Sequence, residues 1–223
     1  MTKKPFDPSS DGAKTNFKTV MSYGDYLNID TVLDQQNCIT GAHDEMLFIV
    51  QHQTSELWLK QILHEMLAAR TALETGNMPN MLKMLSRVSR IFEQLNNQWD
   101  VLRTMTPADY THFRDALGPS SGFQSYQYRM VEFILGNRNP AMLKPHSHVP
   151  KVKKMLQLEL SRTSFYDEVI KFLFNTLDGT TKDMPVPQLD TPHEARPAVQ
   201  ERWKIVYQDV ETHWNLYELA EKL

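Results

Sequence analysis

The chain from residue 43 to residue 75 carries mostly apolar side chains at every third or fourth position, and this spacing constrains the fold more than any other feature. The stripe consists of Leu47, Val50, Thr54, Trp58, Ile62, Met66, Ala69 and Leu73. Residues three and four apart share one face of a helix, so the spacing predicts a long amphipathic helix. Gly76, Asn77 and Pro79 then interrupt the pattern.

A second stripe with the same spacing follows at once. It consists of Met81, Leu85, Val88, Phe92, Leu95, Trp99 and Leu102. Asn80 is a suitable N-terminal cap, so we predict a second helix over residues 80–102. Since the connection is short, the two long helices should lie antiparallel.

Shorter helical segments fill the rest of the chain. Thr106 and Pro107, with Asp109 three residues after the threonine, predict a helix that runs to about Leu117. Further helices are expected over residues 123–135, 149–160, 164–177 and 197–223, with loops at 118–122 and 178–196. No segment shows the alternation of a strand. The sequence therefore predicts an all-α helical bundle.

Composition excludes several classes of protein. The 223 residues include 24 Lys and Arg against 27 Asp and Glu, a net charge of −3, and no block of like charges, so nucleic acid and anionic membrane surfaces are not expected partners. No apolar run approaches the roughly 20 residues of a membrane span. The single cysteine, Cys38, cannot form an intrachain disulfide, which favours a reducing, cytoplasmic compartment.

The two ends of the chain carry separate predictions. Residues 1–22 are polar and lack an apolar segment, so we interpret them as a flexible arm that precedes one helical domain over residues 23–223. Tyr23 and Tyr26 follow this arm and could dock on the core or on a neighbouring subunit. The last apolar stripe runs to Leu223 without a stop signal, so we expect the natural polypeptide to continue.

Several short motifs suggest chemistry that their context does not support. Residues 118–122 match G-x-S-x-G, but a helix is expected where the hydrolase elbow needs a strand. His64 begins a zinc signature whose second histidine is replaced by Ala68. A lone Asp-x-x-His at 109–112 does not make a di-iron site. His146 and His148, between two prolines, are more typical of a loop than of a metal site.

Two polar pairs share helix faces. Phe48 and His52 are four residues apart, so an aromatic ring and an imidazole should point at one spot, although a partly buried structural histidine would show the same pattern. Tyr110 and Arg114 have the same spacing and could offer a hydroxyl and a bidentate fork to a carboxylate. A surface arginine is an equally good interpretation of the second pair.

Four strings, in order along the chain, resemble the tryptophan 2,3-dioxygenase family of haem enzymes. They are YGDYL at 23–27, HDEMLFIVQHQTSELW at 43–58, FRDALGPSSGFQS at 113–125 and QYR at 127–129. The resemblance covers about residues 23–140 and is weaker onward to Leu223. It implies an all-helical homotetramer that binds haem b. It also implies insertion of both atoms of O₂ across the C2–C3 bond of the L-tryptophan indole, giving N-formyl-L-kynurenine.

The resemblance implies specific site residues. The substrate-binding set is Phe48, Ile49, Val50, Gln51, His52, Tyr110 and Arg114, completed by Tyr23 and Tyr26 of a neighbouring subunit. Ser121 and Gly122 would lie near the distal side of the haem. Because part of the pocket would come from a second subunit, oligomerisation would be obligatory.

Each implied role agrees with the chemistry of the residue. His52 would accept a hydrogen bond from the indole N–H, as an orienting residue rather than an obligatory base, since indole nitrogen is a very weak acid. Arg114 would clamp the substrate carboxylate with the help of Tyr110, and Phe48 would pack on the indole. A flat apolar amino acid needs such an arginine, aromatic wall and acceptor.

One departure from the family pattern concerns the iron. The resemblance implies a proximal histidine downstream of residues 217–223, and none of the eight histidines here has that context, so no metal ligand is assigned. Two alternatives stay open at this point. One is a catalytically silent helical scaffold, and the other is a haem dioxygenase for a different indole.

Overall fold

The computed structural model describes residues 7–189, 191 and 193–223, and the regular structure in these ranges is entirely helical. The first part contains η1 (Pro8–Asp11), α1 (Tyr23–Leu27), α2 (Ile29–Leu33), α3 (Glu45–Glu74), α4 (Met78–Asn97), α5 (Trp99–Leu102), α6 (Pro107–Arg114) and η2 (Asp115–Leu117). The second part contains η3 (Gly122–Gln124), α7 (Tyr126–Leu135), η4 (Pro140–His146), α8 (Pro150–Leu160), α9 (Phe165–Asp178), α10 (Pro197–Gln208) and α11 (Trp214–Lys222). The all-α prediction is confirmed.

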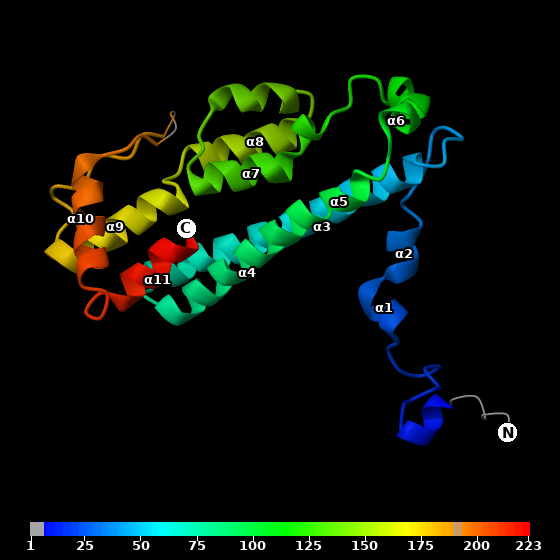
Figure 1. Cartoon of the computed structure of the whole chain (residues 1–223), viewed down its shortest axis with the longest axis horizontal. Coiled ribbons are helices and arrows are strands. Elements are labelled where there is room, and N and C mark those ends of the chain that lie inside the picture. Colours follow the sequence, from blue (N-terminus) through cyan, green and yellow to red (C-terminus); the bar gives the residue numbers. More distant parts are fainter. Residues whose placement is uncertain (1–6, 190, 192) are drawn as a thin grey trace.

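The helices α3 and α4 form the antiparallel pair that the sequence predicts, and they run side by side along the body of the molecule (Figure 1). Two cross-links show the direction. Arg87 Nη1 lies 2.6 Å from Glu65 Oε1, and Gln98 Nε2 donates to Ser55 Oγ at 2.5 Å, so positions further along α4 meet earlier positions of α3.

The start of α4 differs from the prediction. Asn77, and not Asn80, caps the helix, since Asn77 Oδ1 accepts from the Asn80 amide at 3.4 Å. The reason is Pro79, whose missing N–H is harmless in a first turn and which therefore lies inside the helix rather than before it. The second stripe also divides, because α4 ends at Asn97 and α5 begins at Trp99.

The core lies along the C-terminal part of α3. Ile62, Met66 and Ala69 are completely buried against α4, α7 and α9. Earlier in the same stripe, Val50 and Trp58 are 40% and 39% exposed, so this end of the predicted amphipathic helix is only partly buried. The physical reason is that α7 to α9 lie over the later turns of α3, as Figure 1 shows.

Buried charged side chains connect helices and loops that are distant in the sequence. Arg70 of α3 forms an ion pair with Glu159 of α8 at 2.7 Å, and both side chains are about nine-tenths or more buried. Arg138 is completely buried and donates to the backbone oxygens of Leu160 (2.7 Å), Leu189 (3.3 Å) and Arg162. Burial lowers the pKa of this guanidinium from its ordinary value.

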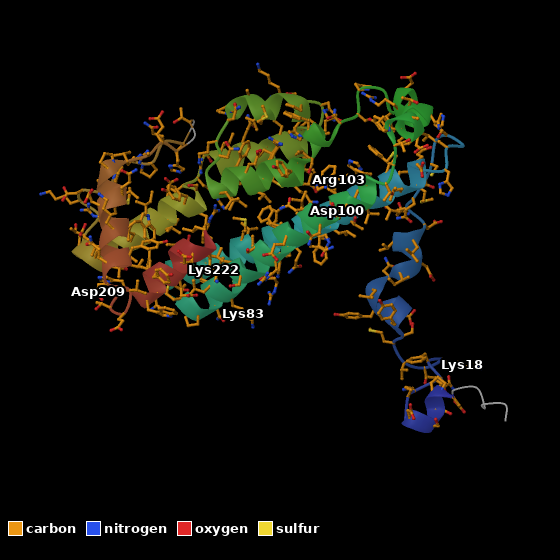
Figure 2. The ribbon with its side chains drawn as sticks, in the orientation of Figure 1. Lys18, Lys83, Asp100, Arg103, Asp209 and Lys222 are labelled. Atoms are coloured by element: carbon orange, nitrogen blue, oxygen red, sulfur yellow. The ribbon has the colours of Figure 1, made fainter. Side chains whose placement is uncertain are left out.

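Two predicted helices end or begin elsewhere. The helix expected over residues 197–223 is divided into α10 and α11, because residues 209–213 turn between them and Asp209 Oδ1 accepts from the Thr212 amide (3.2 Å) at the position labelled in Figure 2. The helix expected from residue 123 begins at Tyr126, where Ser125 supplies the cap. In both places a local side-chain hydrogen bond, and not the spacing of the apolar residues, determines where the helix begins or ends.

The segment formed by α1 and α2 extends away from the helical body (Figure 1). Its junction with α3 is held by Glu45, a buried carboxylate that accepts from the amides of Ile39 (2.7 Å) and Thr40 (2.8 Å) and from the Thr40 hydroxyl. The Thr40 hydroxyl and these amides hold the pKa of Glu45 below its ordinary value.

Part of the predicted arm, residues 1–6, lies outside the described residues. Of residues 7–22, only Pro8–Asp11 form a helical turn, and nearly all of the segment is exposed. Among the described helices, none is both long and apolar enough to cross a bilayer.

The buried guanidinium of Arg138 gives a stability prediction. Arg138→Leu removes a completely buried guanidinium that donates to three backbone carbonyl oxygens, and the contact with Leu160 is itself buried. Unsatisfied buried groups are costly, so the free energy of unfolding should fall by about 2–4 kcal/mol. Urea unfolding followed by circular dichroism measures this change. The control is Arg103→Leu, which removes an exposed ion pair to Asp100 (Figure 2) and should change stability by less than about 0.5 kcal/mol. Equal losses of stability in the two variants would contradict a structural role for the buried Arg138.

Candidate active site

Two adjoining cavities lie beside the N-terminal half of α3. The first has a volume of about 480 Å³ and is lined by Phe48, His52, Glu56, Leu117, Ser120, Ser121, Gly122, Gln124, Ser125 and Tyr126. The second, of about 280 Å³, is lined by Gln51, His52, Ser55, Glu56, Leu59, Trp99, Gly122, Phe123, Ser125, Tyr128 and Arg129. Because His52, Glu56, Gly122 and Ser125 line both, the cavities share a wall.

The helix α3 places Phe48 and His52 on one face, with ring centroids 4.1 Å apart. His52 Nδ1 lies 2.7 Å from the Phe48 carbonyl oxygen. A carbonyl oxygen can only accept, so Nδ1 carries the proton, and in the neutral ring Nε2 is left as an acceptor. The side chain that lines both cavities is therefore a hydrogen-bond acceptor for a ligand.

A cluster of aromatic rings from α6 supports this face of α3. Phe48 lies 5.9 Å from Tyr110 and 5.5 Å from Phe113, and the rings of Tyr110 and Phe113 meet edge to face at 5.4 Å. Phe113 is 1% exposed and anchors the cluster. The sequence reasoning did not single out Phe113, although its spacing of three from Tyr110 places both on one helix side.

Arg114, at the end of α6, turns toward the loop that follows. Its Nη1 donates to the Gly118 carbonyl oxygen at 2.8 Å. Gly118 has φ of 55°, in the left-handed region, where the loop changes direction after η2. Arg114 is not among the residues that line the first cavity, but its contact ties it to the loop that carries Ser121 and Gly122.

The loop itself is organised by short-range hydrogen bonds. Ser121 Oγ accepts from the Phe123 amide at 3.2 Å, and Gln124 Oε1 accepts from the Ser121 amide at 3.3 Å. Ser125 Oγ then accepts from the Tyr128 amide at 3.1 Å and begins α7. Helical turns stand on both sides of the loop, so it lacks the strand that a nucleophile elbow requires.

The remaining predicted residues have different surroundings. Gln51 is buried and lines the second cavity, and within the described part of the chain its Nε2 has no hydrogen-bond partner. Ile49 and Val50 line neither cavity, because the helical period turns them away from the Phe48–His52 face. Tyr23 and Tyr26 are 76% and 75% exposed on α1, which extends away from the helical body (Figure 1).

The second cavity contains an arginine that the sequence reasoning did not single out. Arg129 is 8% exposed, pairs with Glu132 at 2.5 Å, and its Nε has no partner among the residues that the structure describes. Its guanidinium stacks near the rings of Tyr128 (4.8 Å) and Phe123 (5.2 Å). Apart from the string at 127–129, no pattern in the sequence indicated this side chain.

The histidines predicted to lie in a loop are His146 and His148. His146, in η4, is 3% exposed, and its Nε2 has no hydrogen-bond partner in the described ranges. Burial and, to a smaller extent, the charge of Arg129 lower its pKa. Across residues 7–189, 191 and 193–223, no three His, Cys, Asp or Glu side chains are grouped as metal ligands.

Comparison with known proteins identifies the family of the chain. Residues 8–165 match the family model of tryptophan 2,3-dioxygenase. The tryptophan 2,3-dioxygenase of Ruegeria sp. (strain TM1040) is 65% identical over 223 residues, covering 100% of this chain and 80% of that protein. Those of Bradyrhizobium diazoefficiens and Pseudomonas fluorescens are 54% and 48% identical, covering 100% and 94% of this chain and 80% and 74% of theirs. The chain therefore belongs to the tryptophan 2,3-dioxygenase family.

Proposed function

We propose that this protein inserts both atoms of O₂ across the C2–C3 bond of the indole of L-tryptophan and forms N-formyl-L-kynurenine. The observation that carries the proposal is the hydrogen bond between His52 Nδ1 and the Phe48 carbonyl oxygen, which leaves Nε2 as an acceptor beside an aromatic ring in the cavity wall. An indole has one N–H donor and one flat apolar face, and these two groups match them.

In this proposal Phe48 packs on the indole and His52 accepts its N–H. Tyr110 lies 5.9 Å from Phe48 and, with Arg114, assists in holding the substrate carboxylate. Arg114 uses Nη1 for the Gly118 carbonyl oxygen, so its other N–H groups are the donors for the substrate. Together these residues orient the amino acid and exclude water, while His52 need not remove a proton.

The cofactor in this proposal is haem b, and side chains of the second cavity would supply part of its site. Leu59, Trp99, Phe123 and Tyr128 give that cavity an apolar part, and Arg129 offers a buried Nε, without a partner among the described residues, to an anionic group such as a haem carboxylate. Trp99, Phe123, Tyr128 and Arg129 would hold the group, with Ser121 and Gly122 on its distal side. When bound, ferrous haem supplies the chemistry with O₂. No axial ligand is assigned among the described residues.

We further propose a homotetramer in the cytoplasm, with Tyr23 and Tyr26 of one subunit completing the pocket of a neighbour. Both rings are about three-quarters exposed here, and exposed aromatic side chains are typical of association surfaces. Glu45 holds the junction of this segment with α3 through backbone donors, so the segment leaves the body in a fixed direction.

The direct test is turnover. The protein is purified with haemin added, reduced, and supplied with L-tryptophan and isotopically labelled O₂. Both oxygen atoms should appear in N-formyl-L-kynurenine by mass spectrometry. A folded protein that forms no product would support the silent scaffold, and turnover of only a different indole would support the second alternative.

The role of Arg114 gives a specificity prediction. Arg114→Leu removes the guanidinium that would bind the carboxylate, so transition-state binding of tryptophan should weaken by about 2–5 kcal/mol. The corresponding fall in kcat/KM is on the order of 30-fold or more. Turnover of an indole without a carboxylate should change little. Steady-state kinetics on both substrates measure the difference, with Arg103→Leu as the control arginine. Equal losses on both substrates would argue against a carboxylate clamp.

The role of His52 gives a second kinetic prediction. His52→Ala removes an orienting acceptor, so kcat/KM should fall roughly 10- to 100-fold, while haem affinity stays unchanged. Haem titration of the ligand-free variant measures affinity, and turnover measures kcat/KM. A variant that no longer binds haem would place His52 on the cofactor instead of on the substrate.

The proposed tetramer gives a complementation prediction. The double change Tyr23→Ala and Tyr26→Ala should raise KM, because it leaves the neighbouring pocket open. Mixed tetramers of this variant with Arg114→Leu should regain turnover, since some pockets then combine an intact segment with an intact Arg114. Mixtures that show only the average of the two variants would mean that the tyrosines act within their own subunit.

A further inference from the structure

The side chain of Gln127 joins α7 to α3 beside the candidate site. Its Nε2 donates to the Glu56 backbone oxygen at 2.8 Å and to Glu56 Oε2 at 2.8 Å. An amide nitrogen carries two hydrogens, so both are used and the side chain has one orientation. The two residues are separated by 71 positions in the sequence, so this is a tertiary contact.

This contact holds the segment that carries the loop. Within the described ranges, two side-chain hydrogen bonds and no ion pair join α3 to residues 118–135. Gln127 makes both hydrogen bonds. The apolar anchors of α7, Met130, Phe133 and Ile134, are buried on later turns of that helix. The first turn, directly after the loop, therefore depends on Gln127 for its polar attachment.

Glu56 lies where the position of the loop decides the shape of both cavities. It lines the two of them, as does His52, one helical turn earlier on α3. The opposite side of each cavity includes Gly122 and Ser125 from the loop and the cap of α7. A shift of the first turn of α7 would change the distance between the loop and His52.

We propose that Gln127 is a positioning residue, which acts through Glu56 to fix residues 118–125 over His52. Gln127 lines neither of the two cavities, and its effect on turnover rests on the proposed function. Since misplacement by about 1 Å can cost as much as 100-fold in rate, one well-placed pair of hydrogen bonds is enough to matter.

The first test needs no ligand and no activity. Hydrogen exchange in the ligand-free protein should show faster exchange at residues 118–128 in Gln127→Leu, which fills similar space but cannot donate. The matched control is Gln94→Leu, on the exposed face of α4, which should exchange as the unmodified protein does. Thermal unfolding of both variants checks that they are folded. Unchanged exchange at 118–128 in Gln127→Leu would overturn the proposal.

Changes at Glu56 separate the hydrogen bond from the charge. Glu56→Gln keeps an acceptor for Gln127, so exchange at residues 118–128 should stay slow, whereas Glu56→Leu should speed it. If Gln127→Leu does not fold, this pair still decides the question. Fast exchange in Glu56→Gln would show that the charge of Glu56, and not its hydrogen bonds with Gln127, holds the loop. That result would contradict the proposal.

The kinetic test connects the contact between Gln127 and Glu56 with the reaction. In Gln127→Leu the KM for tryptophan should rise about tenfold, with a smaller change in kcat, because the loop closes the pocket around bound substrate. A KM equal to that of Gln94→Leu would overturn the positioning role even if exchange increases. If the unmodified protein forms no N-formyl-L-kynurenine, the proposed function fails, while the exchange data still test the contact between Gln127 and Glu56.

Discussion

The antiparallel contact of α3 with α4 is the interaction on which the rest of the structure depends. Ile62, Met66 and Ala69 are completely excluded from solvent there. Arg87 of α4 and Gln98, the C-terminal cap of α4, connect to Glu65 and Ser55. A helix of 30 residues is rigid when one part is packed, because its hydrogen bonds are local. The packed end therefore fixes the direction of the other end.

This arrangement explains why the site lies on the N-terminal half of α3. That half is not covered by the core, so Phe48, His52 and Glu56 project at intervals of one turn beside the loop and the cavities. Their mutual spacing is set by the helix and needs no further support. Their distance from residues 118–125 is not set by the helix and depends on contacts such as the one made by Gln127.

The sequence predicts those features that depend on neighbouring positions. The 3.6-residue period indicates α3 and α4, the capping box at Thr106 indicates α6, and the spacing of four predicts that Phe48 and His52 meet. It does not predict the break at 209–213 or the start of α7, because side-chain caps there outweigh a continuing apolar pattern.

The tertiary features of the site could not be predicted from the sequence. The contact of Gln127 with Glu56 and the cavity around Arg129 need segments about 70 residues apart to be brought together, and no periodicity reports such a distance. The roles that the resemblance implies for Ile49 and Val50 stay predictions. Ile49 and Val50 stand between Phe48 and His52 in the matching string, yet the helix turns both away from the cavities. A role for either in binding would therefore require a surface supplied by another subunit, as proposed for Tyr23 and Tyr26.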